Sequence, residues 1–186
     1  MKCPLLLSLA ITWNLQDPAV ELKAGDAAPA FESVDDAGIP WKSADHVGKR
    51  VVVVYFYPAS FTGGCTGQAI AFQSDMKKFK DQDVEIVGIS GDAVNTQEAF
   101  KRLYKLDFAI LSDAKGDVAK QFGVPVKPGG KVKQEIGDTV EEFTRDVAFA
   151  RWTFVIGRDG KVAHKNTKVN PAQDSKAVLE ILATLQ

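Results

Sequence analysis

VVVVYFYPASFTGGCTGQ, residues 51–68, is the stretch around which the rest of the chain is organised. It opens with an unbroken apolar run of β-branched and aromatic residues, which is typical of a strand buried on both faces of a largely parallel sheet. Pro58 and the Gly63-Gly64 pair then indicate a turn. Beyond the turn, apolar residues recur with the spacing of one helix face: Ala69, Phe72, Met76 and Phe79. The sequence therefore predicts a strand, a turn and a helix that ends near residues 80–81.

Cys65 falls in the first turn of this predicted helix. Unpaired backbone N–H groups and the positive end of the helix dipole converge at such a position. Both stabilise a thiolate, which is the nucleophilic form of cysteine. A lone cysteine is more often a buried packing residue, but this position favours a reactive thiol.

Composition narrows the class of protein. The chain has 186 residues, 45% of them hydrophobic, which is enough for one domain with its own core. Its 23 basic and 24 acidic residues are well mixed, so no nucleic-acid partner is expected. The two cysteines, Cys3 and Cys65, exclude a disulfide framework and a cysteine-rich zinc site. His46 and His164 lie far apart in the sequence, so neither a metal nor another cofactor is predicted.

Residues 1–21 are predicted to be a leader outside the folded domain, which we place at residues 22–186. Lys2 followed by an apolar run has the order of a signal peptide, and the run is too short to span a bilayer. The single positive charge and the lack of a clear cleavage site argue against export. A disordered extension or an upstream start codon explains the segment equally well. Localisation thus stays open between the cytoplasm and the cell envelope.

The remaining pattern predicts an α/β sheet. Residues 31–42 resemble a hairpin with Asp/Gly turn chemistry, and residues 84–90 indicate a parallel strand beside the first. Further elements are expected in this order: a helix at 97–104 capped by Asn95 or Thr96, a strand at 108–111, a helix at 117–122, a strand at 148–156, a returning strand at 161–164, and a terminal helix from Pro171. Residues 124–146 contain a turn at 127–131 and then lack a firm period, so we interpret them as a partly ordered surface insertion.

The motif Pro58-x-x-x-Thr62-x-x-Cys65 resembles the active-site signature of the peroxiredoxins, thiol peroxidases of the thioredoxin-type fold. Further stretches are similar to the branch called peroxiredoxin Q or bacterioferritin comigratory protein: residues 22–31, 84–90, 111–113 and 151–156. They occur in the family's order and at roughly its spacing. The resemblance implies a thioredoxin-type fold with a central mixed sheet flanked by helices and an N-terminal hairpin.

The resemblance also implies an activity, the reduction of hydrogen peroxide and alkyl hydroperoxides through a sulfenic acid on Cys65. Thr62 would donate its hydroxyl to the peroxide and accept from a neighbour. The N–H groups of Gly64 and Cys65 would point into the same space, and Pro58 would shield the thiolate without offering an N–H. Arg151, on a strand beside the central one, would hold the thiolate ionised and polarise the peroxide.

Ordinary structural roles compete with some of these interpretations. On spacing alone, Thr62 would pass for a helix cap and Arg151 for a surface charge. Gln68 would pass for a helix surface residue, although it matches an acidic or amide position common in relatives.

Two positions depart from the family pattern. Many members of the branch carry a resolving cysteine five residues after the first, and Ile70 stands there. Cys3 lies in the predicted leader, so the sequence favours a one-cysteine enzyme recycled by an external thiol such as thioredoxin, glutaredoxin or a small thiol. Gly63 replaces a proline common in relatives, which predicts a looser loop before Cys65.

Other functions compete with a peroxidase. A thiol–disulfide oxidoreductase of thioredoxin type needs Cys-x-x-Cys, and the matching position is Thr62. A cysteine hydrolase needs His46 or His164 close to Cys65. The non-enzymatic alternative is a thioredoxin-fold binding or chaperone-like module in which Cys65 is inert.

Overall fold

The computed structural model describes residues 20–185. The first half of this region contains β1 (Glu32–Asp35), β2 (Pro40–Lys42), the short 3-10 helix η1 (Ser43–Asp45), β3 (Val51–Phe56), α1 (Gly63–Ser74), α2 (Met76–Asp81), β4 (Val84–Ser90) and α3 (Val94–Tyr104). The second half contains β5 (Ala109–Ser112), α4 (Asp117–Gln121), β6 (Val126–Ile136), β7 (Thr139–Phe149), β8 (Trp152–Ile156), β9 (Val162–Asn166) and α5 (Asp174–Thr184).

Within residues 20–185 a seven-stranded mixed sheet has the order β2-β1-β5-β4-β3-β8-β9. The strands β3, β4 and β5 run parallel, while β8 pairs with β3 antiparallel and β1 pairs with β5 antiparallel. The β1–β2 hairpin turns where the Asp35 side chain accepts the backbone N–H groups of Ala37 and Ile39. The mixed sheet and its N-terminal hairpin confirm the predicted fold class.

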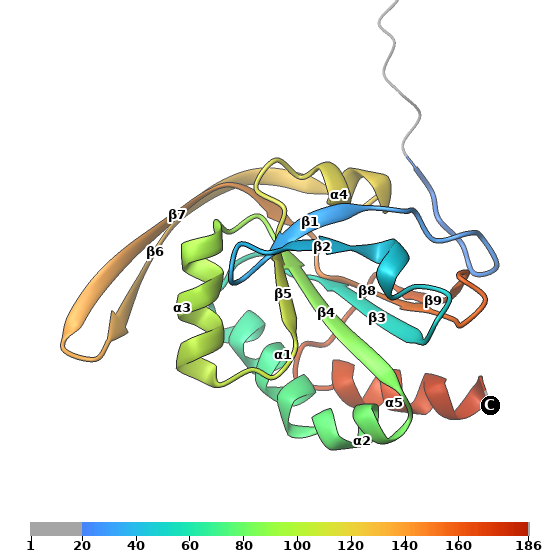
Figure 1. Ribbon diagram of the computed structural model, residues 1–186. Coiled ribbons are helices and arrows are strands. Elements are labelled where there is room, and N and C mark those ends of the chain that lie inside the picture. The colour runs from blue at the N-terminus through green and yellow to red at the C-terminus, as the bar shows by residue number, and fades with distance from the viewer. Residues whose placement is uncertain (1–19, 186) are drawn as a thin grey trace, which may run out of the picture.

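The central strand β3 is buried on both faces, as its unbroken apolar run predicts. Its side chains alternate between two core clusters, with Val53 and Tyr55 in one and Val52, Val54 and Phe56 in the other. The first cluster is covered by α1, α2, α3 and α5, and the second by α4 and the N-terminal hairpin (Figure 1). Because helices or strands cover both faces, the ends of β3 are the places where this strand presents groups to solvent.

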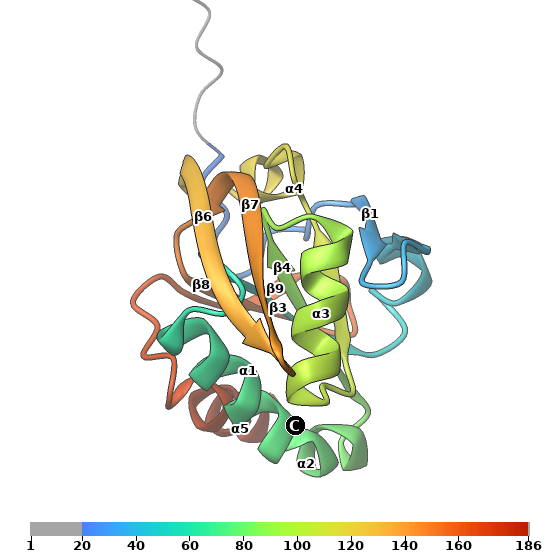
Figure 2. The same ribbon diagram turned by 90° about the vertical axis from the view of Figure 1, so that its left-hand side faces the viewer.

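The segment 124–146 is not a partly ordered insertion, so that prediction is wrong. It forms the antiparallel pair β6–β7, which pairs from Val126↔Phe149 to Ile136↔Thr139 and extends past α3 as a long arm (Figures 1 and 2). Most of its side chains are exposed, which explains why the sequence lacks an apolar period there. The reversal lies at Gly137, which has φ +60°, and the Pro-Gly-Gly stretch is part of β6 instead.

Glycine at position 129 has a steric reason within this arm. A Cβ there would lie 2.2 Å from the carbonyl oxygen of Arg145 on β7, so no larger residue fits. The pattern that resembled a turn in the sequence therefore marks a close approach of two strands.

Several element boundaries also differ from prediction. The helix that follows Cys65 is interrupted at Asp75, which separates α1 from α2. Helix α3 begins at Val94 with Ala93 as its N-cap, so the predicted cap at Asn95 or Thr96 is wrong. The last helix begins at Asp174, because residues 171–173 form a turn after Asn170.

The predicted strand at 148–156 is divided into the end of β7 and the whole of β8, which belong to different sheets. Arg151 lies in the corner between them.

The predicted leader lies almost wholly outside the described residues, and Cys3 with it. Its boundary at residue 21 therefore stays a prediction. Among the helices of residues 20–185, none is long and apolar enough to cross a membrane.

Candidate active site

The active-site loop, residues 57–62, connects the end of β3 to the start of α1. Thr62 is the N-cap residue with extended backbone angles, and the first helical bond runs from Thr66 N–H to the Thr62 carbonyl. Cys65 thus lies in the first turn, as predicted, and the N–H groups of Gly64 and Cys65 precede that bond. The thiol is free and 2% exposed. Its sulfur is enclosed by protein and borders a helix N-terminus.

Arg151 reaches this sulfur from the residue position just before the neighbouring strand β8. The pairing of β3 with β8 places Trp152 opposite Phe56, so Arg151 precedes β8 at the end of β3 where the active-site loop begins. Its Nη2 donates to Cys65 Sγ at 3.2 Å, and its Nη1 donates to Gln68 Oε1. A cation at this distance stabilises negative charge on sulfur. The predicted meeting of Arg151 with Cys65 is therefore observed.

A buried thiol at a helix start, in contact with a guanidinium from the adjacent strand, is the arrangement that the sequence motif implied. The model of the AhpC/TSA family matches residues 24–165. The chain belongs to this family.

Curated relatives identify the branch. Chloroplastic peroxiredoxin Q from Sedum lineare is 36% identical over 163 residues, covering 87% of this chain and 78% of that protein. Chloroplastic peroxiredoxin Q from Oryza sativa subsp. japonica is 36% identical over 166 residues, covering 89% and 69%. This chain is a peroxiredoxin of the peroxiredoxin Q type, a thiol-dependent peroxidase that reduces hydroperoxides at the expense of a thiol.

Solved structures agree with the fold. Peroxidoxin BcpB from Mycobacterium tuberculosis superposes with a TM-score of 0.73 at 32% identity, covering 89% of this chain and 99% of that one. Peroxiredoxin Q from Xanthomonas campestris has a TM-score of 0.71 at 23% identity, covering 91% and 100%, and supports the fold alone.

The Thr62 hydroxyl of this peroxiredoxin is oriented differently from prediction. Its Oγ1 donates to the carbonyl oxygen of Ala59 at 2.9 Å, and it makes no side-chain cap to the helix. Since a hydroxyl has one proton, Thr62 in this arrangement has only lone pairs to offer a substrate. Thr62 is the N-cap residue of α1, as the alternative interpretation as a helix cap predicts, although its side chain makes no capping hydrogen bond. Its donation to the peroxide stays a prediction, and in this structure the hydroxyl proton is directed to Ala59.

Gly64 precedes Cys65 in the first turn of α1, and Pro58 lies in the active-site loop. A Cβ on Gly64 would lie 3.4 Å from Arg151 Nη2, so the glycine lets the guanidinium approach the backbone of α1. Pro58 is half-buried at the bend that follows β3. It has no N–H with which to bind the sulfur.

Gln68 is completely buried, and its interpretation as a helix surface residue is wrong. Arginine only donates, so Gln68 Oε1 must face Arg151, and Nε2 then donates to Asp174 Oδ2 at 2.7 Å. Thr153 Oγ1 donates to the same carboxylate oxygen at 2.7 Å. This chain of directed hydrogen bonds fixes the plane of the guanidinium from the C-terminal helix.

The sequence carried a partial signal for this network. Gln68 is three residues after Cys65, so both lie on one face of α1. Asp174 gave no local signal, because it is brought to the site only when α5 packs against α1.

Burial controls the protonation of the groups around this network. It raises the pKa of Asp174, whose Oδ1 is buried without a hydrogen-bond partner. Burial also raises the pKa of Tyr55 well above its usual range, and that phenol likewise has no partner. Tyr55 is therefore a neutral neighbour of Cys65 and Arg151.

The two histidines lie on other elements than Cys65, and His164 is close enough to Asp174 to act on its charge. His46 Nδ1 is 2.8 Å from Glu85 Oε2, and its ring stacks on Trp41 with centroids 4.4 Å apart. His164 lies on β9 opposite Val155. These positions supply no general base to Cys65, so the cysteine-hydrolase alternative is not supported.

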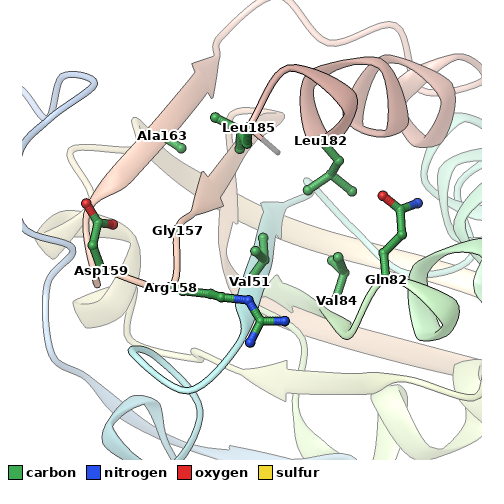
Figure 3. Close-up of a pocket in the computed structure, with 9 residues that line it drawn as sticks. All are labelled: Val51, Gln82, Val84, Gly157, Arg158, Asp159, Ala163, Leu182 and Leu185. Atoms are coloured by element: carbon green, nitrogen blue, oxygen red, sulfur yellow. The ribbon is translucent and has the colours of Figure 1, made fainter.

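A cavity of about 460 Å³ lies beside the start of β3 (Figure 3). Its lining includes Val51 at the start of that strand, Leu182 on α5 and Arg158. Because Cys65 follows the other end of β3, this cavity is separate from the active site.

Proposed function

We propose that Cys65 is the residue that attacks the hydroperoxide and that this peroxiredoxin works with one cysteine. The observation that carries the proposal is the contact of 3.2 Å between Arg151 Nη2 and Cys65 Sγ. A fixed cation over the sulfur stabilises the thiolate before the reaction and the charge that develops on the leaving oxygen during it.

In the first step the Cys65 thiolate attacks one oxygen of the peroxide and the O–O bond breaks. The sulfur gains that oxygen as a sulfenic acid and is oxidised, while the other oxygen leaves as hydroxide or alkoxide and takes a proton to give water or an alcohol. The attack needs sulfur and both oxygens in line, which favours a rigid set of polar groups.

The groups around Cys65 fit both oxygens of the substrate. Arg151 and the N–H groups of Gly64 and Cys65 offer donors, whereas Thr62 offers an acceptor because its proton is held by Ala59. Hydrogen peroxide and alkyl hydroperoxides carry an O–H that this acceptor would receive. Pro58 would limit access of water to the thiolate.

In the second half of the cycle an external thiol attacks the sulfenic sulfur, forms a mixed disulfide and releases water. A second thiol then releases Cys65 in its reduced form. Ile70 stands where a resolving cysteine would be on α1, and it is 44% exposed. Thioredoxin, glutaredoxin and a small thiol are the reductants that we propose to compare.

The test uses Cys65→Ser with Cys3→Ser as its matched control. Hydrogen peroxide is added to each protein, and sulfenic acid is followed with a dimedone trap. Turnover is then measured with thioredoxin, glutaredoxin and a small thiol in parallel.

We expect Cys65→Ser to lose both reactions and Cys3→Ser to keep both. Fast trapping without turnover in Cys3→Ser would make Cys3 a resolving residue and overturn the one-cysteine cycle. Trapping in Cys65→Ser at the wild-type rate would remove Cys65 from the chemistry.

A further inference from the structure

Strand β7 presents two buried side chains toward the active-site loop. Phe143 is 5% exposed and Arg145 is 8% exposed, whereas Thr144 between them is exposed. Since side chains alternate along a strand, Phe143 and Arg145 share one face of the arm. Figure 2 shows β7 running beside α3.

Arg145 holds the active-site loop through Asp92, which is completely buried. Arg145 Nε donates to Asp92 Oδ1 at 2.6 Å. The other oxygen, Asp92 Oδ2, accepts the Ser60 backbone N–H at 2.7 Å and the Ser90 hydroxyl at 2.8 Å. One carboxylate thus connects β7 with the loop backbone two residues before Thr62.

Phe143 holds the next residue of the loop. Phe61 has φ +64°, a left-handed conformation that costs a non-glycine residue about 1–2 kcal/mol. Its ring stacks on Phe143 with centroids 4.9 Å apart and meets the edge of Phe100 at 5.3 Å. These contacts offset the strain and keep the backbone turned so that Thr62 and Cys65 follow in their places.

The backbone of the arm is also fixed at this point. Asp92 and Arg145 form an isolated antiparallel bridge. A Cβ on Gly91 would lie 2.2 Å from the carbonyl oxygen of Val147, so β7 passes directly against the segment that carries Asp92. The arm is therefore attached by backbone as well as by side chains.

We propose that the β6–β7 arm positions the active-site loop for peroxide reduction, with Phe143 and Arg145 as positioning residues that act through Phe61 and Asp92. The inference rests on the proposed role of Cys65 and adds an explanation of how the loop beside this residue is held in position. Buried ion pairs seldom add net stability, and Arg145 Nη2 is buried without a partner. The Arg145–Asp92 pair is thus better explained by the geometry it imposes than by the stability it contributes.

Displacement of the loop should affect the reaction of Cys65 with peroxide more than its reaction with an alkylating agent. Attack on a peroxide requires sulfur, donors and acceptor in one geometry, and a displacement of about 1 Å can cost on the order of 10²-fold in rate. Alkylation by iodoacetamide requires the thiolate but not that arrangement of Thr62 and the loop N–H groups. A displaced loop should therefore slow oxidation much more than alkylation.

The experiment measures both rates at Cys65 in Phe143→Ala and Arg145→Met, below the unfolding temperature of each variant. Thr144→Ala is the matched control because its side chain faces solvent on the same strand. Arg145→Lys is the rescue variant because it keeps a cation within reach of Asp92. If Phe143→Ala does not fold, Phe143→Leu takes its place.

We expect the oxidation rate of Cys65 to fall about 10- to 100-fold in Phe143→Ala and Arg145→Met, while the alkylation rate of both variants stays at the wild-type value. Both rates should be unchanged in Thr144→Ala. Arg145→Lys should recover part of the oxidation rate. Unchanged oxidation in folded variants, or an equal fall in both rates, would overturn the positioning role. Wild-type protein that is alkylated but not oxidised at Cys65 would instead refute the proposed function.

Discussion

The guanidinium of Arg151 lies 3.2 Å from the sulfur of Cys65 although the two residues are 86 positions apart in the chain. The contact forms because β8 pairs antiparallel with β3, and the register brings Trp152 opposite Phe56. The same guanidinium donates to Gln68 on the helix that carries Cys65. Arg151 therefore connects Cys65, the helix that carries it and the start of the adjacent strand.

Replacing Arg151 with lysine should lower the rate of peroxide reduction by about 10²–10³. Lysine keeps the charge, but its single ammonium group does not reproduce the planar fork that serves Cys65 and Gln68 together. Single-turnover oxidation of Cys65 measures the effect. Arg158→Lys is the control, because Arg158 is exposed and bonds to Asp83 far from the thiol. A rate for Arg151→Lys equal to that of the control would exclude the fork from the mechanism.

Asp174 should make stability depend on pH in a predictable direction. Burial raises its pKa above the ordinary value of 3.8, so the folded state binds the proton more tightly than the unfolded state. The free energy of unfolding must then fall as pH rises from the ordinary value through the folded-state pKa.

Asparagine at position 174 carries no titrating proton, so the pH-dependent contribution of Asp174 to the free energy of unfolding disappears. We expect Asp174→Asn to gain stability relative to wild type as pH rises from acidic to neutral. Urea unfolding of both proteins across this pH range measures the difference. Parallel stability curves for the two proteins would contradict the prediction.

Phe61 should reverse the usual order of alanine and glycine substitutions. Removing its ring costs about 3–5 kcal/mol in either variant because the contacts with Phe143 and Phe100 are lost. Alanine keeps the strain of the left-handed backbone, whereas glycine relieves it by about 1–2 kcal/mol.

Phe61→Gly should therefore unfold at higher denaturant than Phe61→Ala. At Phe143, which lies in a strand, the same pair of substitutions should follow the ordinary order with alanine the more stable. Finding alanine more stable at both positions would show that the angle at Phe61 is not strained.

Proline at position 63 should stabilise the protein by about 0.4–1 kcal/mol. Gly63 is the first residue of α1, where proline is well tolerated, and Thr62 before it has φ −93° and ψ 144°. A Cβ at Gly63 would meet no atom within 4 Å. Thermal unfolding measures the gain, and Gly67→Pro in the middle of α1 is the opposite control. Destabilisation by Gly63→Pro would mean that the loop needs the freedom of glycine.

Residues close in sequence determined the central part of this protein. The apolar run of β3, the Pro58 signal and the helix spacing after Cys65 all concern neighbouring residues, whose conformations follow from local sterics and from burial on two faces. They were sufficient to predict the α/β sheet and the thiol at a helix start. The prediction that Gly63 and Gly64 form the turn is wrong, because both belong to the first turn of α1. The resemblance of the motif then implied the chemistry and the role of Arg151.

Only the tertiary structure determines which segments distant in sequence contact the active site. Thr62 donates to Ala59 across the left-handed residue Phe61, and the Phe61 ring stacks on Phe143 of the β6–β7 arm. The arm has no apolar period because most of its side chains face solvent, so its residue pattern does not predict the two strands. Asp174 joins Gln68 only when α5 packs against α1. Hydrogen bonds and ring contacts between such segments depend on the packed geometry, which no local pattern of residues encodes.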